Sequence, residues 1–171
     1  MANVPYISTD TVTKIYNQGR PDETVALNEV SLAIERGRIT VLKGPSGSGK
    51  TSLLSVIGCM SRPTSGRVLV DNRDVVKLPE RFLTDLRRRK FGFIFQQFHL
   101  IRNITVLENI LLPLYPWEMK PGAMKERSLA VLNRFELTGK QHMKVKPSAN
   151  VNWTYWHCWR KVNPTRKLPV S

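Results

Sequence analysis

The sequence predicts an α/β fold in which a glycine-rich loop joins a strand to a helix. Two observations carry this prediction. Short β-branched runs alternate with stretches of helical spacing. In addition, the sequence GPSGSGKTS lies between a β-branched run and a stretch of helical spacing. A length of 171 residues suits one domain large enough to bury a core.

Four strands are predicted from short apolar patterns. Val30, Leu32 and Ile34 alternate with polar or small residues, which indicates a half-buried strand. RITVLKG is a β-branched run typical of a buried strand, and RVLVDN follows a turn rich in Pro, Ser and Gly. The compact aromatic run FGFIFQ completes the set. The four ranges are 25–36, 38–44, 67–72 and 91–96.

Three helices are predicted from apolar spacing and end signals. The first covers TSLLSVIGCM and ends near Gly58, and the second has Pro79 near its start and basic residues at its end. The third is amphipathic, with Met124, Val131, Leu132 and Phe135 on one side. Their ranges are 51–60, 78–90 and 122–135.

The glycine-rich loop fits the pattern G-x-x-x-x-G-K-[ST]. Glycines let the backbone wrap closely around phosphates, and the helix that follows adds the positive end of its dipole. Lys50 would place its ammonium on the β- and γ-phosphates, and the Thr51 hydroxyl would ligate magnesium. The predicted nucleotide-binding residues are Gly44, Pro45, Ser46, Gly47, Ser48, Gly49, Lys50, Thr51 and Ser52.

The text around this loop resembles the nucleotide-binding subunits of ABC transporters over about residues 5–148. VTKIYNQG looks like the adenine-stacking loop of that family, and RRRKFGFIFQQFHLIRNITVLENILLPL looks like its Q-loop. The lipoprotein-release and macrolide-export types are most similar. The resemblance implies an ABC-type P-loop NTPase fold with an N-terminal antiparallel β-subdomain, a partial helical subdomain and an incomplete sheet.

The resemblance also implies cofactors, site residues and partners. ATP and Mg²⁺ would be bound, with Tyr16 stacking on adenine and Gln96 sensing magnesium and the γ-phosphate. A second ATP-binding subunit and a membrane permease would be the partners. The chain would then be cytoplasmic and peripheral to the inner membrane, attached through the permease. Selectivity for the transported substrate would lie in that permease.

Plainer interpretations of several residues remain open. Tyr16 suits a strand aromatic that covers the core, and Gln96 suits an ordinary strand end. The basic run 87–90 is typical of a solvated helix terminus, and Cys59 of a small core residue. His99 has no companion at metal-ligand spacing.

The resemblance stops after Ser148. The printed sequence contains no LSGGQ text, no apolar strand ending in paired acids and no switch histidine in the family's context. The acids after the Q-loop follow stretches with a helical or loop pattern. They are Glu108, Glu118, Glu126 and Glu136. We therefore expect ATP binding without competent turnover, and we interpret 149–171 as a basic, Trp-rich tail that is disordered or arises from a frameshift. Without the family's flanking strands, the strand before the phosphate loop would become an exposed edge.

The formal charge of +14 invites a polyanionic partner, but half of it comes from seven basic residues in 137–171, where no acid occurs. We expect no nucleic-acid partner and no direct membrane insertion. The amino terminus lacks the features of a signal peptide, and the apolar run 104–117 is too short to span a bilayer. Cys59 and Cys158 suit reduced thiols.

Two other functions compete with an ABC-type ATPase. One is a nucleoside monophosphate kinase, because GPSGSGK also resembles the loop of guanylate kinases. In those enzymes the loop lies close to the amino terminus, whereas here more than forty residues precede Gly44. The other is a non-enzymatic module whose aromatic and basic tail binds nucleic acid by stacking and charge.

Overall fold

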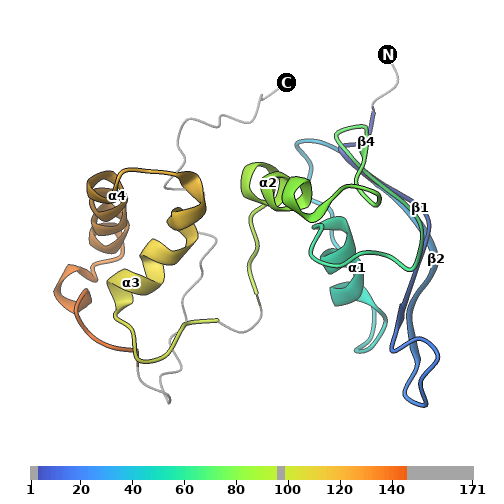
Figure 1. The fold of residues 1–171 in the computed structure, drawn as a ribbon, viewed down its shortest axis with the longest axis horizontal. Helices are drawn as coiled ribbons and strands as arrows, with labels where there is room; N and C mark the ends of the chain where they lie inside the picture. The colour runs from blue at the N-terminus through green and yellow to red at the C-terminus, as the bar shows by residue number, and fades with distance from the viewer. Residues whose placement is uncertain (1–3, 96–98, 146–171) are drawn as a thin grey trace. The chain divides into compact units, whose positions relative to one another are not determined.

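The computed structural model describes residues 4–95 and 99–145, which fall into two compact units (Figure 1). The first unit ends at Phe91 and the second begins at Gly92. In these described ranges no helix is both long and apolar enough to cross a membrane.

A four-stranded antiparallel sheet in the order β2-β1-β3-β4 forms one layer of the first unit (Figure 1). β1 pairs with β2 on one side and with β3 on the other, so both of its backbone edges are hydrogen-bonded. The strands are β1 (Ile7–Tyr16), β2 (Thr24–Ile34), β3 (Ser65–Val70) and β4 (Arg73–Asp74).

Gly66 is required where β3 crosses an irregular stretch of β1. The β1–β3 register shifts between Asp10 and Thr13, and Gly66 has a positive φ of 87°. A Cβ at Gly66 would lie 2.4 Å from the carbonyl oxygen of Thr11, closer than real Cβ atoms approach backbone. The strands can therefore pair this closely only because the residue has no side chain.

Two helices complete the first unit, α1 (Lys50–Ile57) and α2 (Glu80–Lys90). α1 contacts β1, β2 and β3, and it buries Leu53, Val56 and Ile57. The apolar core of the unit comprises Ile7, Val12, Leu27, Leu53, Val56, Ile57, Cys59, Val68, Val70, Val75 and Leu83.

The second unit is helical in its described part. The side chain of Thr105 accepts a hydrogen bond from the backbone N–H of Glu108, whose carboxylate bonds back to Thr105 N, so α3 begins with a capping box. α3 packs against α4, where Leu132 is fully buried. The elements are α3 (Val106–Leu111), the 3₁₀ helices η1 (Leu112–Trp117) and η2 (Thr138–Lys140), and α4 (Pro121–Arg134).

Most elements predicted from periodicity are confirmed. β2, β3, α1, α2 and α4 lie where their patterns place them, and Gly58 caps the end of α1 as predicted. The antiparallel β-subdomain implied by the family resemblance is present as well. β1 and α3 were not predicted as elements from their residues, because β1 is polar at most positions and α3 has only six residues.

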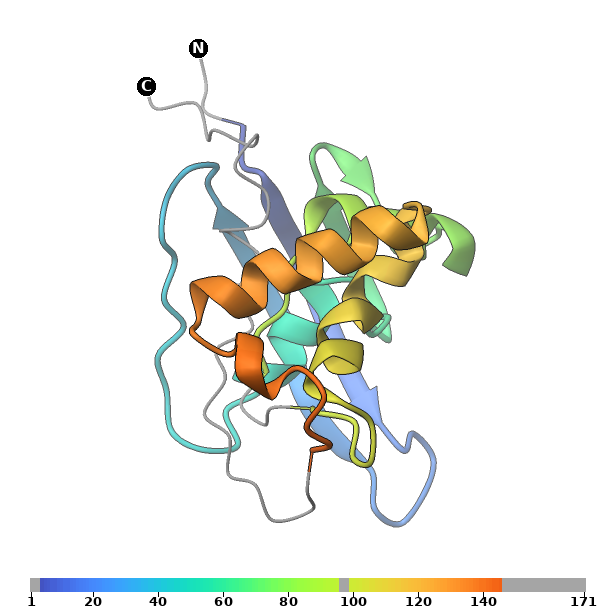
Figure 2. The same cartoon turned by 90° about the vertical axis from the view of Figure 1, so that its left-hand side faces the viewer.

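Two predicted strands are wrong. Residues 38–44 and the described part of 91–96 are not strands. Ile39 is 94% exposed and Val41 66% exposed, and Figure 2 shows the light blue segment after β2 running as a long arc toward α1. The physical reason is pairing, since a strand needs a neighbour to accept and donate its backbone hydrogen bonds, and the described residues supply none here.

Candidate nucleotide-binding site

The predicted phosphate loop lies at the amino-terminal end of α1. Residues 43–48 are exposed and Lys50 is the first residue of the helix. The first turn of α1 contains no acidic residue, so the positive end of its dipole is not neutralised there. The loop is therefore an open, electropositive turn that suits an anion.

Gly49 sets the distance between the loop and the sheet. It caps α1 in the left-handed conformation, with φ 80°, and a Cβ there would lie 2.3 Å from the carbonyl oxygen of Ala26 on β2. Both the conformation and the close approach require glycine. The second glycine of the motif thus allows the loop to pack closely against β2.

The ammonium of Lys50 lies inside the loop. Its Nζ donates hydrogen bonds to the carbonyl oxygens of Gly44 at 2.9 Å and Pro45 at 2.6 Å, and to the Ser48 hydroxyl at 3.0 Å. These acceptors hold the positive charge at the centre of the turn. The same charge is then available to the phosphate oxygens that a P-loop encloses.

Tyr16 is the last residue of β1, near the end of the sheet that Gly49 approaches. It pairs with Thr24, two residues along β2 from Ala26, which Gly49 approaches. Along the strand direction, Tyr16 therefore lies about 7 Å from the level of Gly49. Across the sheet, it lies one strand spacing away. Tyr16 is 38% exposed, and the Lys14 ammonium lies 5.0 Å from the centroid of its ring.

Thr51 and Ser52 occupy the first turn of α1, with Thr51 exposed and Ser52 half-buried. Gln96, the predicted Q-loop residue, lies outside the described residues, as does the tail 149–171. No group of three or more His, Cys, Asp or Glu side chains in the described ranges is arranged to hold a metal.

The acidic residues that follow the predicted Q-loop are placed as the sequence indicates, in helices or loops. Glu108 is engaged in the α3 capping box, and its hydrogen bonds with the Thr105 backbone and side chain lower the pKa of its carboxyl. Glu118 ends η1, Glu126 lies in α4, and Glu136 follows α4.

Arg87 differs from its predicted role as part of a solvated helix terminus. Its side chain is 25% exposed and makes hydrogen bonds to three groups. The run of basic residues gave no sign that Arg87 donates to a carbonyl beyond its own helix. Helical spacing does place two of its partners on the same side of α2, namely Thr84, one turn earlier, and Glu80, two turns earlier. Cys59 is a core residue as predicted, and burial raises the pKa of its thiol to about 11.

The glycine-rich loop, the helix behind it and the antiparallel sheet beside it define an ATPase fold of the P-loop class. The chain belongs to the ABC transporter family, since the model of that family matches residues 27–151. That match ends close to residue 148, where the family resemblance of the sequence stops.

Several relatives share this part of the chain. LolD 1, the lipoprotein-releasing system ATP-binding protein of Rhodopseudomonas palustris, is 40% identical over 139 residues, which are 81% of this chain and 61% of LolD 1. The ABC transporter ATP-binding protein MJ0796 of Methanocaldococcus jannaschii is 42% identical over 77% of this chain and 57% of its own. A macrolide export ATP-binding/permease protein MacB of Burkholderia pseudomallei is 37% identical over 80% of this chain and 21% of MacB.

Solved structures agree with this assignment. A dimeric structure of the ATP-binding cassette MJ0796, in a post-hydrolysis state bound to ADP and Pi, aligns with a TM-score of 0.69 at 40% identity. It covers 81% of this chain and 61% of the MJ0796 chain. The present chain spans about three fifths of the length of the first curated relatives it matches.

Proposed function

We propose that this chain binds ATP with Mg²⁺ through the loop from Gly44 to Ser52, as the ATP-binding part of an ABC transporter. The observation that carries the proposal is the position of Lys50 Nζ inside an exposed turn at the start of α1. Phosphate oxygens would replace the carbonyl and hydroxyl oxygens that now accept its hydrogen bonds. Thr51 would contribute its hydroxyl to magnesium, and Tyr16 its exposed ring to the adenine.

The proposed partners follow from the relatives. MJ0796 forms a dimer in its solved structures, and MacB joins an ATP-binding part to a permease in one chain. For this chain we propose a second ATP-binding subunit and a membrane permease, with a role in export or lipoprotein release like that named for LolD and MacB.

We further propose that the 171 residues bind ATP without turning it over. Hydrolysis requires the γ-phosphate to be clamped and a water molecule to be activated. The sequence contains no LSGGQ text to supply the clamp. Glu108, the first acid after the predicted Q-loop, already serves as a helix cap.

Binding of a fluorescent ATP analogue with Mg²⁺ tests the proposal. We expect Lys50→Ala to weaken binding at least about tenfold, because it removes the ammonium from the phosphates. Lys77→Ala is the matched control, since Lys77 is exposed and lies outside the loop, and it should bind like the unmodified chain. Equal affinity of the unmodified chain and Lys50→Ala would refute the proposed site.

Phosphate release measured on the same proteins tests the absence of turnover. The unmodified chain should release phosphate no faster than Lys50→Ala. A steady rate that disappears in Lys50→Ala would overturn this part of the proposal while leaving ATP binding intact. Transfer of phosphate to GMP or AMP would instead favour a nucleoside monophosphate kinase.

A further inference from the structure

The phosphate-loop helix α1 is held at the end opposite to the loop. It has eight residues, so only about two turns separate Lys50 from the end of the helix. Cys59, just after the helix, is buried and has a positive φ of 60°. A non-glycine residue in this conformation is strained and persists when its surroundings hold it there.

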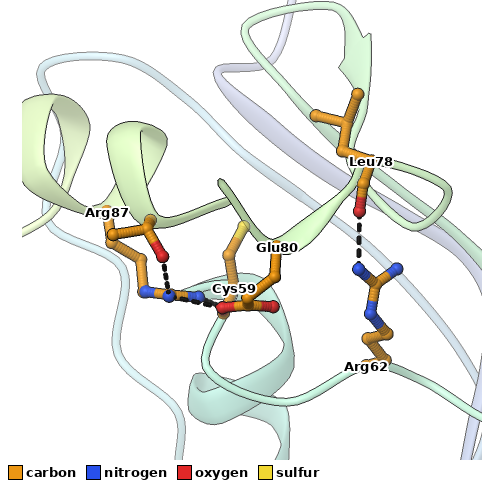
Figure 3. Close-up of polar contacts among 6 residues, drawn as sticks. Cys59, Arg62, Leu78, Glu80 and Arg87 are labelled. Atoms are coloured by element: carbon orange, nitrogen blue, oxygen red, sulfur yellow. Dashed lines mark hydrogen bonds and ion pairs between the residues drawn. The ribbon is translucent and has the colours of Figure 1, made fainter. Parts of the chain in front are cut away.

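Arg87 of α2 supplies the tertiary contact to this turn (Figure 3). Its Nη1 donates a hydrogen bond of 2.6 Å to the carbonyl oxygen of Cys59. A cation is favourable here, since Cys59 directly follows the C-cap Gly58 and the carboxyl end of a helix carries the negative end of its dipole. The bond is charge-assisted and partly shielded from water, because the Arg87 side chain is only 25% exposed.

Two groups on α2 orient the guanidinium of Arg87. Its Nη2 donates to Glu80 Oε1 at 2.6 Å (Figure 3) and to Thr84 Oγ1 at 2.7 Å. The hydrogen bond from Arg87 also lowers the pKa of the Glu80 carboxyl, so the pair stays charged at neutral pH. The arginine is thus fixed on its own helix before it reaches across to α1.

Arg62, which follows this turn in the chain, makes a second tertiary contact. Its guanidinium donates to the carbonyl oxygen of Val76 and, at 2.5 Å, to that of Leu78, both in the segment that leads into α2. Figure 3 shows the bond to Leu78. The carboxyl end of α1 is therefore bonded to α2 and to the approach to α2. By contrast, the phosphate loop at the amino end is bonded mainly by its own Lys50.

We propose that Arg87 is a positioning residue for the nucleotide: by anchoring the Cys59 carbonyl, it fixes the direction in which α1 presents the phosphate loop. The inference rests on the proposed function, since it concerns affinity at that same site. A two-turn helix moves as a rigid body, so loosening one end shifts the N–H groups and the ammonium at the other. Without the anchor, binding must first order α1, and the affinity for nucleotide falls.

The test compares Arg87→Ala with Arg88→Ala in binding of the fluorescent ATP analogue. The two arginines are adjacent on α2, and their side chains are 25% and 23% exposed, but Arg88 forms an ion pair with Asp85 within α2. Each change removes one positive charge. We expect Arg87→Ala to raise the dissociation constant about tenfold and Arg88→Ala to change it less than twofold.

The binding measurement is made at a temperature where circular dichroism shows each variant folded, and amide hydrogen exchange of α1 is followed in parallel. Faster exchange in the first turn of α1 together with weaker binding supports the proposal. A lowered melting temperature with unchanged affinity would show a purely structural role and overturn it. Equal weakening in both variants would show that lost charge is responsible, which also overturns it.

Two further comparisons distinguish failure of this inference from failure of the proposed function. If Arg87→Ala does not fold, Arg87→Lys takes its place, because a lysine keeps the charge but cannot reach all three acceptors with a planar fork. We then expect about a threefold loss of affinity, and no loss would overturn the proposal. If the unmodified chain and Lys50→Ala bind alike, the proposed function fails. If they differ and Arg87→Ala matches the unmodified chain, only the present inference fails.

Discussion

Strand β3 and the segment from Arg38 to Lys43 carry the same kind of pattern but lie in opposite environments. Val68 and Val70 of β3 are each 1% exposed, whereas Ile39 is 94% and Val41 66% exposed. Both runs are β-branched and short. β3 pairs with β1 on one side and with β4 on the other, and the segment pairs with no strand in the described part of the chain.

The difference shows that a short β-branched run can form a strand, but does so only where a neighbouring strand pairs with it. Two ladders hold β3 in the sheet, where Val68 and Val70 belong to the apolar core and α1 contacts the strand. The segment that enters the phosphate loop has equal apolar content and no such support. Substitutions in the two regions should therefore differ greatly in their effects on stability.

The largest effect is expected for Gly66→Ala, because Gly66 lies in β3, which is paired on both sides. The new Cβ would lie 2.4 Å from Thr11 O and 2.7 Å from Asp10 O, in a conformation that alanine disfavours. We expect a loss of at least about 3 kcal/mol in the free energy of unfolding, measured by urea denaturation. Gly37→Ala is the control, since its φ is 77° but its Cβ would meet nothing within 4 Å, and it should cost about 1 kcal/mol. Equal costs would contradict the close-approach argument.

A moderate effect is expected for Val70→Ala. Removing two methyl groups from a side chain that is 1% exposed should cost about 2 kcal/mol in the same denaturation experiment. Val25→Ala on β2 is the matched change, because Val25 is 56% exposed, and it should cost less than about 0.5 kcal/mol. A similar loss in both would show that burial does not distinguish the positions.

A small effect is expected for Asp71→Asn, at the turn between β3 and β4. Asp71 forms ion pairs with Lys90 and with Arg36, the latter just before the exposed segment. The hydrogen bond from Lys90, more than any other contact, lowers the pKa of Asp71. Its side chain is 45% exposed, so solvent screening limits the contribution to about 0.5 kcal/mol.

The pH dependence of the Asp71 contribution has a definite sign. Since the folded pKa is lowered, the stabilisation is present above the ordinary pKa of 3.8 and is lost as the pH falls through the folded value. Melting temperatures of the unmodified chain and Asp71→Asn should differ slightly at pH 7 and converge toward pH 2 or in high salt. A difference that grows in acid would refute this account.

The smallest effect is expected for Ile39→Ser, within the exposed segment. The change should alter the free energy of unfolding by less than about 0.5 kcal/mol and reduce self-association seen by light scattering, because an apolar unpaired run promotes it. A cost above about 2 kcal/mol would mean that Ile39 is buried in solution, and the contrast with β3 would then disappear.

At the candidate site, the local structure was predicted from the motif. The pattern from Gly44 to Thr51 predicted a glycine-rich loop that leads into a helix near Lys50, and this helix is observed. Such a loop depends on neighbouring residues and on glycine conformations, which are local properties. The closeness of Gly49 to Ala26 was not predictable, because it depends on how α1 packs on β2.

The sequence by itself determined the family, the phosphate-loop motif and the elements with strong periodicity, because these depend on residues close together in the chain. The tertiary structure alone decided which apolar runs became strands and which arginine of α2 turned inward to Cys59. It also decided that Gly66 must be glycine. The physical reason is that pairing, burial and close approach are set by partners distant in sequence, and periodicity does not name those partners.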